Sequence, residues 1–448
     1  MNLHAMLRRR EACGALVRIG LIGCGKFASM FLAQLPRTPG FHVAAIADLA
    51  PARARANLAR IGWEAGRSAA SGLDDAFARR TTWLTEDAPA MLADPRIDVV
   101  IEATGNPTAG VAHARAAIAA GKHIVMVNVE ADVLAGPALA AEAAKAGVVY
   151  SLAYGDQPAL VCELVDTLRT SGFSVTAAGK GTKYLPAFHA STPATVWGHY
   201  GLSPEDAEAG GMNPQMFNSF LDGTKSGIEM AAIANATGLA APEDGLLFPP
   251  CGIDDLPLVL RPAAEGGVLA GKGMVEVVSS LERDGRAVCR DLRWGVYAVF
   301  EGETDYVRRC FAEYGVRTDP SGRYGALWRP YHFIGLELGV SVASAVLRRE
   351  PTGAPGAWRA DVVAVAKRDL ATGEVLDGEG GATVWGKVVP AERSLSLSAL
   401  PIGLAHGVTL TRPIAAGAVV TWADVRAKDD AATLYRRAME AGEARAAA

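Results

Sequence analysis

Lysines stand near small and acidic residues at two places in the middle of the chain, a composition suited to polarising a carbonyl group. Lys180 and Lys183 lie among glycines after an expected strand, and Lys225 follows an Asp-Gly-Thr turn that begins at Asp222. Glu229 comes four residues after Lys225, so the two side chains share a face if the segment is helical. A cation beside a carbonyl oxygen stabilises the alkoxide that forms during hydride transfer. The alternatives are solvated loop lysines and Asp222 as a simple helix cap.

Three more residues with reactive side chains stand where elements are expected to begin. Asp156 follows the last strand expected in the first third of the chain, where it is a candidate acid, base or metal ligand, or the N-cap of the next helix. Arg329 and His332 precede an apolar run that is predicted to be a helix. A guanidinium there suits a carboxylate or a phosphate, whereas a single histidine is more often structural. The identity of any divalent metal ion stays open.

A turn near the N-terminus has the spacing of a dinucleotide-binding loop. The strand expected at residues 17–22 runs into a G-x-G-x-x-A sequence formed by Gly23, Gly25 and Ala28, which opens a helix. The first glycine permits the tight turn, the second lets the backbone approach a pyrophosphate, and the alanine allows close packing of helix and strand. The helix N-terminus then faces the anion. The pattern therefore predicts a nicotinamide dinucleotide site, with an unliganded tight turn as the alternative.

The choice between the two nicotinamide cofactors depends on the end of the next strand. Asp48 would accept hydroxyls of the adenosine ribose and favour NAD, whereas Arg53 and Arg55 could neutralise the 2′-phosphate of NADP. We expect NADP and keep NAD as the alternative. A second contact is expected after the strand at residues 99–103. The residues predicted to hold the cofactor are Gly23, Gly25, Lys26, Phe27, Ala28, Asp48, Thr104, Gly105, Asn106 and Asn128.

Short β-rich runs alternate with alanine-rich amphipathic runs over residues 17–155, a pattern typical of parallel strands joined by helical crossovers. The expected strands are residues 17–22, 42–47, 99–103, 123–128 and 148–152. The expected helices are residues 27–35, 51–62, 109–120 and 137–146. This third of the chain is predicted to be a doubly wound parallel sheet of the Rossmann type.

Longer helices and separated strand runs follow, which indicates a second domain of α+β type. Its loop-rich stretch, residues 186–213, is either a lid or an ordered surface loop. After residue 350 the chain becomes rich in Gly and Pro and then in short β-runs. Two related phrases there, KRDLATGEVL at 367–376 and TRPIAAGAVV at 411–420, resemble the compact all-β SAF or β-clip module.

The fold class is therefore α/β, with a Rossmann domain, an α+β catalytic and dimerisation domain and a small all-β SAF-like domain. The expected boundaries are residues 1–16 for an N-terminal extension, 17–155 for the dinucleotide-binding domain, 156–350 for the catalytic domain, 351–426 for the SAF-like domain and 427–448 for a C-terminal tail.

Composition excludes several classes of protein. The 448 residues, 50% hydrophobic and 21% charged, are too apolar for disorder and too many for one core. A net charge of -4 gives no general basic field for nucleic acid. Apolar runs are too short to span a bilayer, and the N-terminus lacks the apolar core of a signal peptide, so a cytoplasmic location is expected. Six dispersed cysteines fit neither a disulfide framework nor a zinc site. We expect a small-molecule substrate and neither nucleic acid nor membrane as partner.

Four motifs together resemble the homoserine-dehydrogenase-like oxidoreductases, and among them the bacterial enzymes similar to 1-deoxy-D-xylulose 5-phosphate reductoisomerase. The motifs are VNVEADV at 127–133, AYGDQP at 153–158, GKGTKY at 179–184 and MFNSFLDGTK at 216–225. The resemblance implies NADPH, a homodimer and the conversion of 1-deoxy-D-xylulose 5-phosphate to 2-C-methyl-D-erythritol 4-phosphate, a step of isoprenoid biosynthesis.

The resemblance also implies roles for the candidate residues. It implies a set that holds phosphate and polarises oxygens, Lys180, Lys183, Lys225 and Arg329, and a pair that handles protons or a divalent ion, Asp156 and Glu229. Ordinary homoserine dehydrogenases instead oxidise an amino alcohol, with a lysine and acidic residues placed much as Lys225 and Asp222 are here, and typically lack a SAF-like tail. A further alternative is a regulatory nucleotide-binding protein without catalysis.

Overall fold

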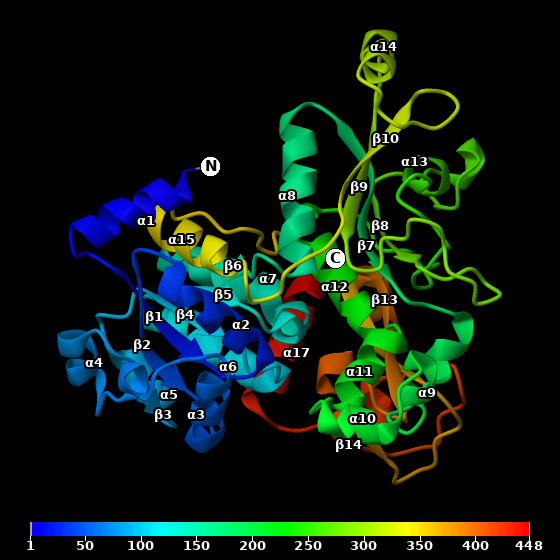
Figure 1. Cartoon of the computed structure of the whole chain (residues 1–448). Coiled ribbons are helices and arrows are strands. Elements are labelled where there is room, and N and C mark those ends of the chain that lie inside the picture. The colour runs from blue at the N-terminus through cyan, green and yellow to red at the C-terminus, as the bar shows by residue number, and fades with distance from the viewer. Residues whose placement is uncertain (1, 448) are drawn as a thin grey trace. The chain divides into compact units, whose positions relative to one another are not determined.

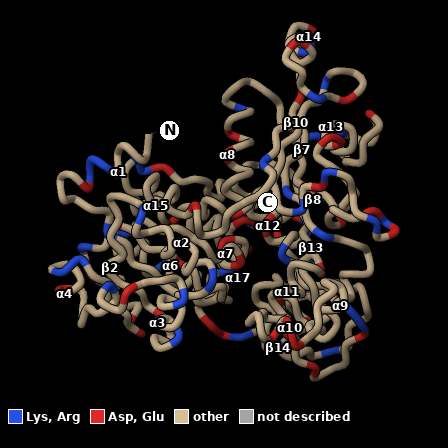
Figure 2. Tube along the Cα trace, viewed as in Figure 1, with Lys and Arg blue, Asp and Glu red and all other residues tan. Residues whose placement is uncertain are grey.

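The computed structural model describes residues 2–447 and divides the chain into two compact units. The first unit comprises Met1–Leu160 together with Phe333–Pro355, and the second comprises Val161–His332 together with Gly356–Ala448. The blue and cyan strands in Figure 1 belong to the first unit. Charged residues of both signs are distributed along both units (Figure 2), in agreement with the small net charge.

A six-stranded parallel sheet forms the centre of the first unit. Its strands are β1 (Val17–Ile22), β2 (Phe41–Ala47), β3 (Trp83–Thr85), β4 (Val99–Glu102), β5 (His123–Met126) and β6 (Tyr150–Leu152). They lie in the order β3-β2-β1-β4-β5-β6, the strand order of a Rossmann fold. The predicted doubly wound sheet is thus confirmed. The sequence missed β3, because a strand of three residues shows too little periodicity to be recognised.

Helices surround this sheet. They are α1 (Leu3–Ala12), α2 (Lys26–Gln34), α3 (Pro51–Arg60), α4 (Leu73–Arg79), α5 (Ala88–Ala93), α6 (Pro107–Ala119), α7 (Val129–Ala146) and α15 (Gly339–Leu347), with short 3-10 turns at η1 (Leu35–Arg37) and η2 (Ala65–Ser68). The buried core includes Leu3 and Leu7 from α1 and Val342 from α15 as well as strand residues such as Ile19. The N-terminal segment therefore contributes to the core of this unit.

Two element boundaries differ from the sequence-based prediction by more than three residues. Helix α7 begins at Val129, eight residues before the predicted start at Pro137, which lies inside the helix. Pro137 was taken as a helix start because proline is common at that position. Helix α15 begins at Gly339 and not directly after His332. Gly335 interrupts the run, since it adopts φ +73° where a Cβ would collide with the Phe27 carbonyl oxygen.

A mixed four-stranded sheet organises the first part of the second unit. Its strands are β7 (Ser174–Thr182), β8 (Met274–Ser279), β9 (Val296–Glu301) and β10 (Tyr324–Arg329), in the order β10-β9-β7-β8. Strand β8 runs parallel to β7, and β9 runs antiparallel to both β7 and β10. The helices are α8 (Gln157–Thr170), which begins in the first unit, α9 (Val196–Tyr200), α10 (Pro204–Ala209), α11 (Pro214–Leu221), α12 (Thr224–Thr237), α13 (Leu256–Val259) and α14 (Asp305–Glu313), with η3 (Pro186–Ala190) and η4 (Ala263–Glu265).

Helix α12 lies at the centre of the second unit. It packs against β7 and β8 and also against β11 (Ala360–Ala366) and β13 (Val384–Pro390) of the C-terminal region. Most of its residues are buried, including the charged Glu229. The loop-rich stretch at 186–213 carries η3, α9 and α10, which enclose a small core around Trp197. That stretch is therefore an ordered, packed part of the unit.

The C-terminal region is built from short antiparallel pairs. Strand β11 pairs with β13, and β14 (His406–Leu410) lies between β12 (Val375–Asp377) and β15 (Val425–Arg426). Helix α16 (Ala391–Leu397), η5 (Ile402–Leu404) and η6 (Trp422–Asp424) connect them.

The two related phrases of the sequence pair with each other in this region. Leu370 and Ile414 occupy the same place in each phrase and exchange two backbone hydrogen bonds of 2.8 and 2.9 Å. Gly373 and Gly417 follow three residues later with φ +85° and +80°. The repeat thus produces two interlocked turns, which confirms the predicted small all-β module.

Helix α17 (Ala431–Ala447) closes the chain and is anchored by one buried cation. The Arg436 guanidinium is fully buried, lies 2.5 Å from Asp361 Oδ2 on β11 and 2.7 Å from Glu440 Oε1, and covers the Trp358 ring at 4.6 Å. The tail is therefore part of the second unit.

Two negative findings complete the fold. Among residues 2–447, no helix is long and apolar enough to cross a membrane. Within the same residues all six cysteines are free thiols.

Candidate active site

The glycine-rich loop of the first unit has the geometry of a dinucleotide-binding turn. Gly23 adopts φ +88°, and a Cβ there would lie 2.7 Å from the Ala103 carbonyl oxygen, so only glycine fits. A Cβ on Gly25 would meet nothing within 4 Å. Open space therefore lies at the N-terminus of α2, where backbone N–H groups can receive a phosphate. Ala28 is fully buried, as close helix-strand packing requires.

Asp48 supports the same loop from the end of β2. Its Oδ2 accepts the Cys24 N–H at 2.8 Å, and its Oδ1 accepts the Ala50 N–H at 2.8 Å. Arg53 Nη2 lies 3.4 Å from Oδ1 on a side chain that is 70% exposed. A carboxylate suited to ribose hydroxyls and a guanidinium suited to a 2′-phosphate thus stand together. Lys26 and Phe27 form the first turn of α2 beside them.

Replacing Arg53 with alanine is expected to weaken NADPH binding about tenfold and to leave NADH binding nearly unchanged, because one exposed charge-assisted contact to the 2′-phosphate is lost. Calorimetric dissociation constants for both nucleotides measure this. Arg60→Ala is the matched control, since Arg60 is exposed in the last turn of the same helix. Equal losses for NADPH and NADH in Arg53→Ala would show that Arg53 does not read the phosphate.

The second predicted cofactor contact is a turn that also organises two helices. Thr104 and Gly105 follow β4, and the side chains of Asn106 and Asn128 cap α6 and α7. Asn128 Nδ2 donates to the Asn106 carbonyl at 2.8 Å, which ties the two helix starts together. These four residues lie together as expected, and their contact with a nucleotide stays a prediction.

Glu102 is a buried acidic residue that the sequence analysis did not select. It ends β4, and its Oε1 accepts the Thr104 hydroxyl at 2.5 Å and lies 3.2 Å from His113 Nδ1. Its Oε2 is buried and has no hydrogen-bond partner among the described residues. An acidic residue at the carboxyl end of a Rossmann strand was the available signal, since ligands of such sheets bind at that edge.

Asp132 is a second buried carboxyl in this unit. It lies on α7 and is fully buried. The Tyr150 hydroxyl donates to its Oδ1 at 2.8 Å, and among the described residues its Oδ2 has no hydrogen-bond partner. Burial raises the pKa of Asp132 to about 7, and the Tyr150 hydrogen bond opposes that rise. The folded protein therefore holds a proton on Asp132 that the unfolded chain releases near pH 4.

This proton predicts how stability depends on pH. The stability that this proton contributes is fully present below the pKa that Asp132 has in the unfolded chain. It is lost as the pH rises through the folded pKa of about 7. Asp132→Asn should remove that loss, so the variant should gain about 1.4 kcal/mol per pH unit over the parent between pH 5 and 7. Denaturation of both proteins at pH 5 and pH 8 measures the difference. Parallel pH profiles would contradict the assignment.

Asp156 lies at the end of the first unit, directly before α8. Gly155 precedes it with φ +94°, and Asp156 Oδ1 accepts the Gln157 N–H at 2.9 Å. The carboxylate is therefore held at a helix start, and its role as acid, base or metal ligand stays a prediction.

In the second unit, two of the predicted residues form a buried ion pair. Lys180 on β7 pairs with Glu229 on α12, and the two side chains are only 7% and 3% exposed. Lys225 is half-buried one turn earlier on the same face of α12. The structure thus brings together three of the charges that the sequence selected.

Lys183 has a different environment. Its Nζ donates to the His199 carbonyl at 2.6 Å and lies 5.5 Å from the Tyr200 ring centre. Burial lowers the pKa of Lys183. This lysine holds the segment around α9, and its predicted anion-binding role is not tested by these contacts.

Arg329 and His332 do not lie at a helix start. Arg329 is the last residue of β10, and the half-buried His332 has its Nδ1 2.7 Å from the Trp294 carbonyl oxygen. The prediction that they open a helix is wrong, because Pro330 and the turn before α15 separate them from it.

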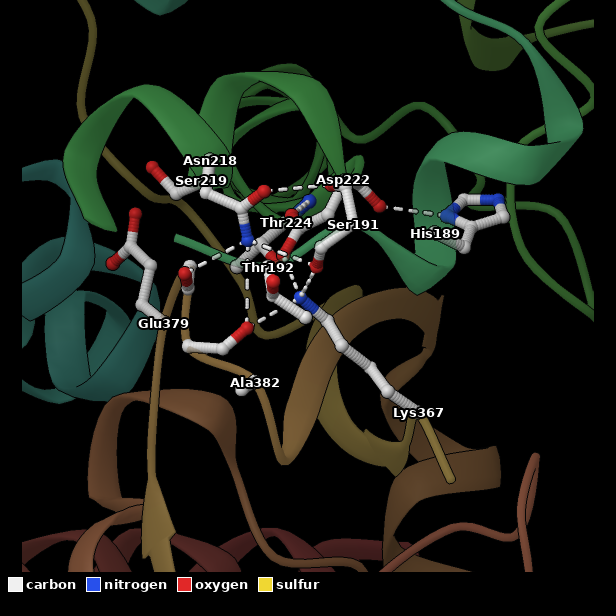
Figure 3. A network of polar contacts seen from close by, with 12 residues as sticks. His189, Ser191, Thr192, Asn218, Ser219, Asp222, Thr224, Lys367, Glu379 and Ala382 are labelled. Carbon is white, nitrogen blue, oxygen red and sulfur yellow. Dashed lines mark hydrogen bonds and ion pairs between the residues drawn. The ribbon is translucent and has the colours of Figure 1, made fainter. Parts of the chain in front are cut away.

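Asp222 takes part in a buried network of hydrogen bonds and an ion pair. Its Oδ2 accepts from Lys367 Nζ at 2.8 Å, and its Oδ1 accepts the Thr224 N–H at 2.8 Å (Figure 3). Lys367 also donates to the carbonyls of Ser191 and Gly381 at 2.7 and 2.6 Å. Burial raises the pKa of Asp222, and the Lys367 ammonium opposes the rise. Asp222 therefore supports the first residue of α12, whose N-cap is Gly223.

His189 lies beside this network. Its Nδ1 is 2.6 Å from the Asp222 carbonyl oxygen and its Nε2 is 2.9 Å from the Tyr184 hydroxyl. Because a carbonyl only accepts, Nδ1 carries the proton and Tyr184 donates to Nε2. Burial lowers the pKa of His189, so the ring is neutral. Neither His189 nor Lys367 was selected from the sequence, since their partners are far away along the chain.

The described residues hold no group of three or more His, Cys, Asp or Glu arranged to bind a metal ion. A divalent ion at the predicted acidic residues remains an untested prediction.

Three family models match successive parts of the chain. Residues 17–154 match the oxidoreductase family with an NAD-binding Rossmann fold, and residues 155–338 match the catalytic domain of oxidoreductase DRL. The chain therefore carries an NAD-binding Rossmann domain and a catalytic domain of oxidoreductase type. Residues 361–426 match the SAF domain. The resemblance to the reductoisomerase-like group is supported by the DRL match, and none of the three models specifies a homoserine dehydrogenase. No curated protein matches the chain.

Several solved structures are similar to parts of the oxidoreductase. A biliverdin reductase from Synechocystis sp. with biliverdin and NADP+ is 21% identical, with 38% of this chain and 48% of that chain covered and a TM-score of 0.25. The oxidoreductase thus spans about half of that protein. A probable dehydrogenase from Thermotoga maritima is 15% identical, with 76% and 91% covered and a TM-score of 0.36. A levoglucosan dehydrogenase with NADH is 15% identical, with 70% and 66% covered and a TM-score of 0.29.

Proposed function

We propose that the oxidoreductase uses NADPH to reduce a small, phosphorylated, sugar-derived carbonyl compound. The observation that carries the proposal is the buried Lys180–Glu229 pair with Lys225 one turn away. Removing two charges from water costs several kcal/mol each, so such a pair is weak evidence for stability. Buried charged pairs of this kind are typical of active sites, where they stabilise charge that develops in the transition state.

Each residue of this group has a distinct proposed role. The Lys225 ammonium donates to the carbonyl oxygen and stabilises the alkoxide as it forms. Lys180 binds an oxygen of the substrate while Glu229 holds its ammonium in place and takes up or returns protons. Bound NADPH supplies the hydride, and the glycine loop with Asp48 holds the nucleotide.

A phosphate on the substrate would be held by the other cations of the predicted set. Lys183 and Arg329 are proposed for that contact, and Asp156 is proposed to handle a proton or a divalent ion. The DRL match further supports a reaction similar to that of 1-deoxy-D-xylulose 5-phosphate reductoisomerase. There the carbon skeleton rearranges to an aldehyde, which is then reduced, as in isoprenoid biosynthesis.

Homoserine dehydrogenase-like oxidation is not proposed. That alternative needs Asp222 beside the reacting lysine, and Asp222 is fully buried and bonded to Lys367 and the start of α12. The alternative of a regulatory protein without catalysis is disfavoured by the buried Lys180–Glu229 pair with Lys225 one turn away.

The experiment that tests the proposal is a screen of NADPH and NADH oxidation against phosphorylated and unphosphorylated sugars and aldehydes. We expect turnover of a phosphorylated sugar carbonyl with NADPH and little with its unphosphorylated form. Turnover of unphosphorylated compounds alone would refute the substrate class. Nucleotide binding with no turnover of any carbonyl would favour the regulatory alternative.

We also propose that the chain forms a homodimer. Strand β10 is an edge strand of its sheet and exposes Leu327 and Trp328. Tyr331 is exposed just after β10, and the exposed Trp294 lies close in space, with its carbonyl oxygen 2.7 Å from His332 Nδ1. Large apolar side chains exposed on a sheet edge favour association with a second copy of the same surface. Sedimentation equilibrium should give twice the mass of one chain, and Trp328→Glu should shift it toward the monomer. A monomeric parent would contradict this.

A further inference from the structure

A pocket of about 230 Å³ lies within the second unit, between the start of α12 and the C-terminal β-module. Its walls come from three segments, the helix start with His189, the loop before β8 and strand β13. The lining residues are His189, Gly223, Gly227, Asp244, Gly245, Leu246, Phe248, Trp385, Gly386, Lys387 and Val388. None of the proposed catalytic residues belongs to this lining.

The pocket lies on the opposite side of α12 from the buried ion pair. Gly227 lines it, and a Cβ there would meet the Gly386 carbonyl at 3.1 Å. Glu229 follows two residues later and pairs with Lys180 on β7. Because successive residues of a helix turn by about 100°, positions two apart point about 200° apart. The pocket is therefore a separate site from the one proposed for reduction.

One wall of the pocket is aromatic and held in place. The His189 and Trp385 rings stack at 4.0 Å, and Phe248 meets the His189 ring at 6.0 Å. Phe248 adopts φ +49°, a strained backbone for a bulky residue, and its N–H donates to the buried Glu276 carboxylate at 3.3 Å. Both nitrogens of the neutral His189 are engaged, so this wall offers ring surface and little hydrogen bonding.

Lys387 places one ammonium group in the lining of the pocket, and its carboxylate partner is easily displaced. Lys387 pairs with Asp244, and their side chains are 19% and 94% exposed. An ion pair with so exposed a carboxylate contributes little free energy, because water competes for it. The Lys387 ammonium is sheltered, and its stem lies against Gly245, where a Cβ would approach within 3.0 Å. The site thus already binds a carboxylate that another carboxylate could replace.

We propose that this pocket binds a small monocarboxylate with a flat apolar body, which displaces Asp244 from Lys387 and lies against Trp385. The anion is then recognised by one sheltered charge and the body by the aromatic wall. Binding itself does not depend on the proposed reductase activity.

Calorimetric titration of the full-length protein with benzoate tests this, with benzamide as the uncharged analogue. We expect saturable binding of benzoate and at least tenfold weaker binding of benzamide. Lys387→Met should weaken benzoate binding about tenfold, because the stem is kept and the charge is lost. Asp244→Asn should strengthen it several-fold, because the internal competitor is removed and the position is almost fully exposed.

The two variants are expected to change benzoate affinity in opposite directions, which makes the result decisive. Absence of saturable benzoate binding to the parent overturns the proposal, as does equal affinity for benzamide or unchanged binding in Lys387→Met. Dissociation constants for NADPH should be the same in parent and variants, which checks that both variants are folded. Failure of the reductase screen would leave the benzoate result unaffected.

Discussion

Gly25→Val is expected to abolish binding of NADPH and NADH while the protein keeps its fold. A Cβ at Gly25 meets no protein atom within 4 Å, so the branched side chain causes no internal collision. It projects into the open space at the N-terminus of α2, where a pyrophosphate must approach the backbone. Calorimetry should therefore show at least a hundredfold loss of affinity, with the melting temperature close to that of the parent.

Gly66→Val is the matched control for this variant. Gly66 lies in η2 of the same unit, and a Cβ there also meets nothing within 4 Å. The same side chain is added, far along the chain from the loop, and nucleotide affinity should not change. If Gly25→Val binds NADPH as tightly as the parent, the loop is not the pyrophosphate site.

The Rossmann domain could be predicted because its signals are local. The G-x-G-x-x-A turn and the following Asp48 lie within one strand-helix-strand unit, where chain order largely dictates neighbourhood. Local signals also misled at Pro137. Proline usually marks the first turn of a helix, and here it lies inside α7, whose N-cap is Asn128.

The polar interior of the second unit could be predicted only in part. Lys225 and Glu229 could be placed on one face of a helix because a helix repeats every three to four residues, and both lie in α12. The partner of Asp222, however, is Lys367, 145 residues away, and comes from the β-module. No periodicity links two such positions, so the sequence could not show that Asp222 forms a buried ion pair with Lys367. His189 was overlooked for the same reason.

Lys225→Met is expected to lower kcat about 100-fold with the best substrate. The lysine lies on the face of α12 that also carries Glu229, where its ammonium would meet the charge that appears only as the carbonyl is reduced. Losing one such contact raises the barrier by about 3 kcal/mol. Because the loss falls on the transition state, kcat should fall more than KM rises, and NADPH affinity should stay the same.

Lys180→Met is expected to affect stability where Lys225→Met affects kcat, and this difference distinguishes the roles of the two lysines. Lys180→Met leaves the Glu229 carboxylate buried without its cation, so the variant should lose several kcal/mol of stability. Adding Glu229→Gln should restore much of that stability, and the double variant should then show a raised KM from the lost Lys180 contact and a lowered kcat from the lost proton carrier. Lys145→Met, at an exposed position in the last turn of α7, is the control for loss of a lysine. If Lys225→Met keeps near-parental kcat, the alkoxide is stabilised by another group, and Lys180 becomes the leading candidate.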